Sequence, residues 1–420
     1  MILGVVMMAT CLLVAIAVFN VGQTVSEKMR ITNTADAAVY SGAVWQARTL
    51  NFQAYTNRAM IANEVAIAQT ISLISWLRYV DQTAKNIPDI ASWNPAMDAA
   101  MAAVGANVTD MNAALIKAAP DIITSLSAIN HDVLSSSQDM VHNAGFMASS
   151  EVINAVIKAN DSNARQTTAS KALFATYESD YENFTKNFSG SYRTRMRTIV
   201  NRSLDKFIKR RSRSDSAKSI EYKKRGGVSM VGLDKWEAFD ALSSYHRECD
   251  STGCEWKENT PIGWGGAKSE KNISDTTLGT YGSAKVNSSA FELAKAKQSV
   301  IAGYKGMPVS RDVRDTKLRD NDAQTLKLAI EVAKPSSKFH TSSGDGIGVD
   351  RLRQENGYAG NEISALAKAE VYFKYPDNQN YAAFSRKIEY ANLYNPFWQA
   401  RLIAPDSKTD VPAVLADKVK

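Results

Sequence analysis

The N-terminus of this chain is an uninterrupted apolar run. No residue from Ile2 to Val21 is charged, and the first charged side chain is Glu27. An α-helix rises about 1.5 Å per residue, so these 20 residues would span about 30 Å, the thickness of the hydrocarbon core of a bilayer. No second apolar segment of this length occurs in the sequence. The run therefore predicts one transmembrane anchor over residues 1–22, with the rest of the chain on one side of the membrane.

A cleaved signal peptide is the alternative interpretation of this run. Residues 15–17 read Ala-Ile-Ala, which has the small-x-small pattern of a signal-peptidase site. Against cleavage, no Lys or Arg precedes the run, and the helical pattern continues past it without a break. We therefore expect a retained anchor rather than a cleaved leader or a helix buried in a soluble core.

Small side chains follow the apolar run in the stretch NTADAAVYSGA, residues 33–43. They fall on one stripe of a helix with a 3.5-residue repeat, whose members are Ile31, Ala35, Ala38, Gly42, Trp45, Phe52, Ala59, Ala66, Leu73 and Leu77. Small residues at Ala35, Ala38 and Gly42 allow another backbone to approach closely. Whether that backbone belongs to another helix of this chain or to a neighbouring subunit stays open.

Composition changes along the remainder of the chain. Residues 94–204 are rich in Ala, Met, Ile and Ser with few glycines, so we predict a helical stalk or bundle over 23–210. A basic linker is expected at 211–232, before a region with many Gly, Trp and Tyr residues. Within that region, EISALAKAEVYFKYP alternates in its later half and predicts a strand that ends at Pro376.

These patterns together predict an α+β fold. A transmembrane helix would continue into the helical stalk or bundle, and a mixed globular domain would occupy residues 233–420.

Cysteine placement bears on the compartment. Cys11 lies in the apolar run, which leaves Cys249 and Cys254 in the loop-like stretch CDSTGC. A disulfide between them would imply an oxidising, extracytoplasmic environment. A pair of metal thiolates is the rival interpretation, but no second Cys or His pair lies nearby to complete a zinc site.

Positive charge is concentrated between residues 193 and 225. This segment has 13 Lys and Arg against three Asp and Glu, whereas the whole chain has a net charge of only +7. A basic amphipathic helix here could contact anionic lipid headgroups, cell-wall polymer or nucleic acid, and the candidate residues are Arg202, Lys206, Lys209, Arg210 and Arg211. The plainer interpretation is a solvated helix and a flexible linker. No nucleic-acid-binding module is recognisable, so we expect no specific nucleic acid partner.

Aromatic residues gather near the C-terminus in YANLYNPFWQARLIAP. Tyr394, Phe397 and Trp398 are expected to form part of a core, because each ring buries a large apolar area. A partner-docking patch is the alternative.

The histidines do not suggest a catalytic or metal site. His131 and His142 would share a helix face but lie about 16 Å apart along it, too far for one metal ion. His246 is three residues from Cys249, but that cysteine has a nearby disulfide partner, so a Cys-His nucleophile is not supported.

Other motifs are equally uninformative about chemistry. Asp345 and Asp350 lie in a Gly-rich stretch, where solvated turns are expected, and GWGG at residues 263–266 reads as a turn. No phosphate-binding loop is present. We therefore predict no catalytic residue, no cofactor and no metal, and a protein that is not an enzyme.

Two stretches resemble a known bacterial family. The apolar helix with the small residues from Ala35 to Ala43 resembles the segment around the transmembrane helix of TadE/TadG-like proteins of Tad (tight adherence, Flp pilus) secretion systems. Residues Ala369 to Pro376 and Leu393 to Leu402 resemble the C-terminal end of larger proteins of that group. The two stretches cover less than a tenth of the chain.

The resemblance implies a single-pass protein of the bacterial inner membrane whose body lies in the periplasm or outside the cell. It implies a structural role in a Tad/Flp-type pilus or secretion apparatus, minor-pilin-like or in assembly, with other subunits as helix-packing partners. Val5 stands where major type IV pilins carry Glu, which argues against a bulk filament subunit. A membrane-tethered extracytoplasmic sensor or binding protein is the alternative, and a tethered periplasmic enzyme is a third class.

Overall fold

The computed structural model describes residues 2–90, 95–217, 220–251, 253–271, 284–314, 325–340, 362–374 and 390–418. Backbone contacts divide the chain into two compact units, each assembled from segments that are distant in the sequence. Unit 1 comprises Met1–Tyr55, Gln138–Lys186 and Arg311–Lys420, and unit 2 comprises Thr56–Ser137 and Asn187–Ser310. The consecutive division of the chain at residues 22, 210 and 232 stays a prediction.

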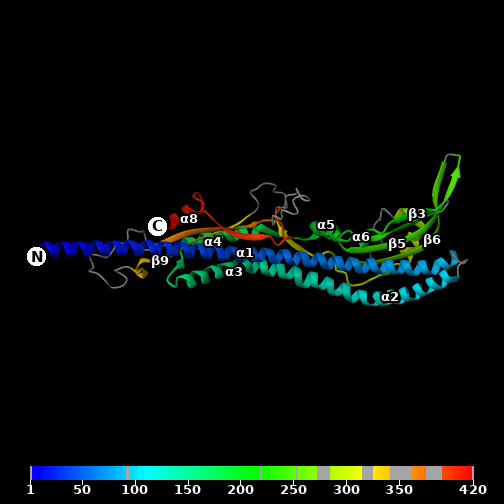
Figure 1. Cartoon of the computed structure of the whole chain (residues 1–420), viewed down its shortest axis with the longest axis horizontal. Helices are drawn as coiled ribbons and strands as arrows, with labels where there is room; N and C mark the ends of the chain where they lie inside the picture. Colours follow the sequence, from blue (N-terminus) through cyan, green and yellow to red (C-terminus); the bar gives the residue numbers. More distant parts are fainter. Residues whose placement is uncertain are drawn as a thin grey trace. The chain divides into compact units, whose positions relative to one another are not determined.

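Helix α1 runs without interruption from Ile2 to Ile90 and contributes to both units (Figure 1). The expected α+β fold class is confirmed, because this apolar N-terminal helix leads into a helical region that is followed by a sheet-rich C-terminal part. The other helices before residue 210 are α2 (Pro95–Ala128), the π-helix η1 (Ile129–Ser135), α3 (Ser136–Asn160), α4 (Thr168–Phe184), the short 3₁₀ helix η2 (Gly190–Arg193), α5 (Thr194–Ser203) and α6 (Lys206–Lys209).

The buried face of α1 follows a repeat of about 3.6 residues rather than 3.5. The predicted stripe residues Trp45, Phe52 and Leu73 are exposed. The buried apolar positions of this part of the helix include Ala47, Leu50, Ala54, Met60, Ile67, Ile71 and Ile74. A straight helix drifts by about 20° per heptad relative to a 3.5-residue repeat, so the heptad stripe rotates away from the core. The stripe prediction is therefore wrong for Trp45, Phe52 and Leu73, although Leu77, its last member, is buried.

In unit 1, helix α3 packs antiparallel along α1. Gln46 Nε2 donates to Ser149 Oγ at 3.5 Å, and Gly42 approaches Ile153 while Gly145 approaches Thr49. Beside these helices lies an antiparallel sheet in the order β1-β9-β10-β11, with bounds Arg165–Gln166, Leu326–Pro335, Glu362–Phe373 and Trp398–Ile403. Strand β10 is the one expected in EISALAKAEVYFKYP, and Pro376 lies outside the described residues.

Both faces of strand β9 are covered, because successive side chains of a strand point to opposite sides. On one side Leu328 lies near Gly42 of α1, and Lys334 Nζ is 2.7 Å from Glu27 Oε2 of the same helix. On the other side Glu331 Oε2 accepts a hydrogen bond from Thr167 Oγ1 at the start of α4, 2.7 Å away. The sheet of unit 1 is thus packed between helices, and its central strand is almost wholly buried.

Unit 2 contains a five-stranded sheet in the order β3-β4-β5-β6-β7. The strands are β3 (Arg213–Ala217), β4 (Ile220–Val231), β5 (Lys235–Asp250), β6 (Gly253–Glu270) and β7 (Ser299–Val300); the first four pair antiparallel, and β7 runs parallel to β6. The helical turn η3 (Ala284–Asn287) and helix α7 (Ser288–Ala296) lie between β6 and β7 in sequence. Strands β3 and β4 therefore occupy most of the described residues of the predicted linker 211–232.

Helix α1 makes a close approach to strand β6 in unit 2. A Cβ built on Gly265 would lie 2.1 Å from the backbone oxygen of Ser75, and one on Gly263 would lie 1.9 Å from Thr83 Oγ1. The GWGG stretch is thus inside a strand, and the expectation of a turn is wrong. Its glycines are needed because any side chain there would displace the helix backbone from the sheet.

Helix α2 runs antiparallel along α1 within unit 2 (Figure 1). Thr109 Oγ1 donates to Asp81 Oδ1 at 2.5 Å, and Asn63 Nδ2 donates to Asn130 Oδ1 at 2.8 Å. Elsewhere in the chain, β2 (Thr185–Phe188) pairs with β8 (Ser310–Val313), and the C-terminal helix α8 (Asp410–Lys418) belongs to unit 1.

Candidate functional site

Residues 2–19 of α1 are exposed, with Ile16 half-buried, and Asn20 is the first buried residue of the helix. Among the described residues, α1 is the helix that is long and apolar enough to cross a membrane, and its most apolar stretch of 18 residues has a mean hydropathy of 2.8 with none of it buried by the rest of the protein. A helix from a soluble core would be covered, so that alternative does not fit. The segment is a candidate membrane span.

The small residues that follow this segment pack against other parts of the same chain. Ala35 and Ala38 are completely buried in the core of unit 1. Gly42 faces Ile153 of α3 and Leu328 of β9, and a Cβ there would lie 2.7 and 3.2 Å from these side chains. The close backbone approach expected from these residues is therefore made by the chain's own helix and strand.

The base of the exposed segment is joined directly to the core of unit 1. Glu27 is buried and accepts a hydrogen bond from Lys334, whose Nζ also lies 3.0 Å from Asp161 Oδ2. Arg30 adds a contact to the same carboxylate at 3.5 Å. Buried charges of both signs stabilise each other only when their geometry is held closely, so this cluster fixes α1 against β9 and the end of α3.

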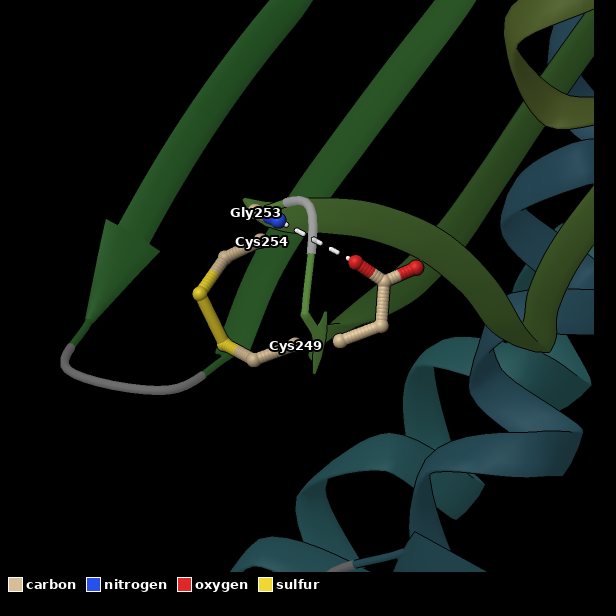
Figure 2. Close-up of a disulfide and its surroundings, with 4 residues drawn as sticks. Cys249, Gly253 and Cys254 are labelled. Carbon is tan, nitrogen blue, oxygen red and sulfur yellow. Dashed lines mark hydrogen bonds between the residues drawn. A yellow bond between two sulfur atoms is a disulfide. The ribbon is translucent and has the colours of Figure 1, made fainter.

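The cysteines at the end of the β5–β6 hairpin are joined (Figure 2). Cys249 and Cys254 face each other across the two strands, and their sulfur atoms are bonded at 2.08 Å. Asp250 Oδ1 accepts a hydrogen bond from the backbone N–H of Gly253, which has a φ of +150°, a value that a residue without Cβ adopts readily. This end of the hairpin extends past β4, whose pairing with β5 stops at His246.

The basic segment is divided between buried and exposed cations. Arg202, Lys206, Lys209 and Arg210 are exposed on α5, α6 and the residue that follows. Arg211 is 7% exposed and donates to both carboxylate oxygens of Asp240, at 2.9 and 2.6 Å. The inclusion of Arg211 among the surface cations is therefore corrected, because its guanidinium is committed to a buried ion pair.

Asp240 collects several donors at the centre of the sheet in unit 2. Besides Arg211, it accepts from Ser75 Oγ of α1 at 2.8 Å and from Lys224 Nζ of β4 at 2.9 Å. Arg211 Nη1 also donates to Ser72 Oγ at 2.6 Å. This network attaches α1 to the sheet through charge-assisted hydrogen bonds. Nothing in the sequence pattern of β5 distinguished Asp240 as its centre.

Of the C-terminal aromatic residues, Trp398 lies in the core of unit 1 and Phe397 is half-buried beside it. Trp398 is buried, with its ring 5.5 Å from that of Phe184 and 5.4 Å from that of Phe373. Phe397 also packs against Phe373. Tyr394 is buried as well. A core arrangement thus accounts for these rings.

Unit 2 contains a buried carboxylate that sequence reasoning missed. Glu64 accepts hydrogen bonds from Trp236 Nε1 at 3.0 Å, from Tyr304 OH at 2.9 Å and from Asn130 Nδ2 at 3.1 Å. Burial raises the pKa of Glu64 to about 7, although the hydrogen bonds from Trp236, Tyr304 and Asn130 act in the opposite direction. The sequence feature that could have identified Glu64 as buried is its position on the face of α1 that repeats every 3.6 residues.

The histidines have separate local roles. His131 Nε2 lies 2.9 Å from the backbone oxygen of Gly306, and His142 stacks on Tyr181 with the ring centres 5.1 Å apart. His246 Nε2 lies 2.8 Å from Glu248 Oε1. In the part of the chain that the structure describes, no group of three metal-ligating side chains occurs. Asp345 and Asp350 lie outside the described residues.

Comparison with known proteins connects the N-terminal segment to one family. Residues 1–47 match the family described as putative Flp pilus-assembly TadE/G-like. The matched region includes the exposed apolar segment of α1, the buried Glu27 and all three small residues that pack in unit 1. No curated protein and no solved structure matches the chain.

Proposed function

We propose that this chain, whose first 47 residues match the family described as putative Flp pilus-assembly TadE/G-like, is a non-enzymatic structural component of a Tad/Flp-type pilus or secretion apparatus. It would be anchored in the bacterial inner membrane and would act in assembly or as a minor-pilin-like subunit. The observation that carries this proposal is the direct continuity between the apolar segment of α1 and the core of unit 1.

That continuity favours a mechanical role over a tethered enzyme. An enzyme that only needs membrane attachment works on a flexible linker, whereas here the same helix continues from the apolar segment into a buried face. Glu27, six residues after Val21, is already held by Lys334. A force or displacement applied to the apolar segment would be transmitted directly to unit 1, because no flexible linker lies between them.

The disulfide supports an extracytoplasmic location of unit 2. Cytoplasmic thiols are kept reduced, so Cys249–Cys254 would persist in the periplasm or outside the cell. Contacts to other subunits are proposed for the apolar segment itself, because Ala35, Ala38 and Gly42 are covered within unit 1. A TM-helix partner could approach at Gly4 or Gly22, where a Cβ would meet no atom within 4 Å.

The test combines topology with partner capture. In spheroplasts of cells that carry the native system, added protease should digest the body of the protein, and the same protease should leave it intact in inverted vesicles. Cross-linking followed by mild detergent extraction should recover other pilus or secretion subunits with the full chain. A variant with three lysines in the apolar segment, at Met8, Leu12 and Val14, should leave the membrane fraction and lose these partners.

Two results would count against the proposal. Protection of the body in spheroplasts would reverse the topology. Recovery of the full chain from membranes without any subunit of the apparatus, under conditions that capture known subunits with one another, would remove the structural role.

A further inference from the structure

Helices α5 and α6 of unit 2 and the residue after them carry four exposed cations within nine residues of sequence. We call the surface formed by Arg202, Lys206, Lys209 and Arg210 the cationic surface. Across the described residues, none of the four makes an ion pair, and Arg210 Nε has a weak contact to Ser212 Oγ at 3.4 Å. The only acidic residue within it, Asp205, is used as the N-cap of α6, accepting from the Ile208 N–H at 2.9 Å.

Several cations close to this surface in sequence form ion pairs within the protein. Arg211 and Lys224 are both paired with Asp240, and Lys223 is 3.0 Å from Glu221. The contrast between Arg210 and Arg211, adjacent in sequence, is informative: one is buried and paired, the other exposed and unpaired. The charges of the cationic surface are therefore not neutralised by ion pairs within the described part of the protein.

The apolar face of the same helices is already covered. Met196, Val200, Leu204 and Ile208 are buried in unit 2. A basic amphipathic helix binds a bilayer by inserting its apolar face below the headgroups. Because that face packs against the protein, α5 and α6 cannot insert without leaving the sheet, and only their charged side is available to a ligand.

An exposed aromatic residue, Phe207, lies between Lys206 and Lys209 in the sequence of α6. Phe207 is 54% exposed, although one edge packs against Trp76 with ring centres 6.2 Å apart. Arg211 lies 5.1 Å from the centre of the same ring, which holds the ring in place. Tyr192, just before α5, is 68% exposed. Exposed rings between cations suit a ligand that has both negative charge and an apolar sugar face.

We propose that the cationic surface of unit 2 binds a linear acidic polysaccharide. The carboxylates of such a polymer would pair with Arg202, Lys206, Lys209 and Arg210, and a sugar ring would stack on Phe207. The choice of a glycan over a nucleic acid rests on the extracytoplasmic location in the proposed function, which the disulfide of the same unit supports. Binding itself, measured with purified protein, does not depend on that location.

Binding should be measured with the purified full-length chain in detergent, using polygalacturonate as the probe and uncharged dextran as the control polymer. We expect saturable binding to polygalacturonate that weakens roughly 50-fold between 50 and 200 mM salt, since four neutralised charges release their counterions, and no binding to dextran. Poly(U) RNA and phosphatidylglycerol vesicles serve as the competing anionic probes.

The decisive variant changes Arg202, Lys206, Lys209 and Arg210 to Gln. Its matched control changes Lys117, Lys171, Lys327 and Lys408 to Gln, which removes the same number of exposed cations elsewhere. The first variant should bind polygalacturonate at least tenfold more weakly, and the second should stay within twofold of the parent. Phe207→Leu should weaken binding severalfold without changing its salt dependence, because it removes the stacking ring and leaves the charges.

Several outcomes would overturn the proposal: equal losses in the two fourfold variants, no binding to polygalacturonate, or tighter binding to poly(U) or to the vesicles. If the fourfold variant does not fold, acetylation of the parent protein decides instead. Polygalacturonate should then protect Lys206 and Lys209 but not Lys117 and Lys171, and equal protection would refute the site. A failed topology test with intact polygalacturonate binding would refute the location alone.

Discussion

Trp236 Nε1 donates a hydrogen bond to Glu64 Oε2 across 3.0 Å, joining strand β5 to helix α1 inside unit 2. Tyr304 donates to the same oxygen, and Asn130, held in the π-helix η1, donates to the other. Four parts of the chain therefore meet at one buried carboxyl group. The ionised group is the better acceptor, but burial disfavours the charge.

The pKa of Glu64 predicts how the stability of unit 2 depends on pH. Burial raises this pKa to about 7 from an ordinary value of 4.5, so the folded state binds a proton more tightly than the unfolded state between these values. The free energy of unfolding should then fall as pH rises from 4.5 to about 7, by roughly 3 kcal/mol, and be independent of this group above that range.

The measurement is denaturant unfolding at a series of pH values between 5 and 8, with Glu64→Gln as the comparison. The variant cannot ionise at this position, so the difference in unfolding free energy between parent and variant should change with pH. Asp234, which acts electrostatically on Tyr304, is retained in both proteins. Parallel pH profiles would show that Glu64 does not titrate in this range.

Arg211→Met should strongly destabilise the protein. It would leave Asp240, which is completely buried, with Lys224 as its remaining cationic partner, and breaking such a pair from one side costs about 3–5 kcal/mol. Arg210→Met is the matched control and should change the unfolding free energy by less than about 0.5 kcal/mol, because Arg210 is exposed. Thermal and urea unfolding check both values. Similar effects of the two substitutions would contradict the buried pair.

Gly265→Val should disrupt the contact between α1 and strand β6. A Cβ at this position would overlap the Ser75 backbone oxygen, which lies 2.1 Å away and cannot rotate aside, so the cost should exceed about 3 kcal/mol. Gly22→Val, where no atom lies within 4 Å, should leave the melting temperature of the folded units nearly unchanged. Circular dichroism during heating compares the two. An equally stable Gly265→Val protein would show that the helix does not approach the strand so closely.

Gly42→Leu tests the small face of α1 in unit 1. The side chain would collide with Ile153, 2.7 Å from the new Cβ, and with Leu328 at 3.2 Å, so we expect a loss of about 2–4 kcal/mol. Combining it with Ile153→Ala should restore part of this loss by making space, which a double-mutant comparison of unfolding free energies measures. If Gly42→Leu impaired only the recovery of partner subunits and left stability intact, the face would be an intermolecular contact.

Removal of the Cys249–Cys254 disulfide should have a small effect on stability. The bond closes a loop of five residues at the end of a hairpin, so Cys249→Ser with Cys254→Ser should cost about 2 kcal/mol or less. In intact cells, both thiols of the parent should resist alkylation until a reductant is added. Alkylation without reductant would place unit 2 in a reducing compartment.

The local sequence was sufficient for elements whose neighbours are close along the chain. The apolar run, the long helix, the strand at residues 362–373 and the proximity of Cys249 to Cys254 all follow from composition and short spacings. The predicted stripe on α1 placed Trp45, Phe52 and Leu73 on the buried face although they are exposed, because the difference between repeats of 3.5 and 3.6 residues accumulates with helix length. Charge density alone likewise did not separate Arg210 from Arg211.

The sequence by itself therefore determined that an apolar helix continues into a face of small residues. Helix length and side-chain size are local properties, so a local pattern suffices for both. The tertiary structure alone decided what that face packs against, which arginine is buried and where Glu64 finds its donors. Those outcomes depend on residues between 29 and 286 positions apart in the chain, such as Arg211 with Asp240, Glu64 with Trp236 and Gly42 with Leu328. Pairings at such separations arise from packing and hydrogen-bond geometry, which the local sequence pattern does not predict.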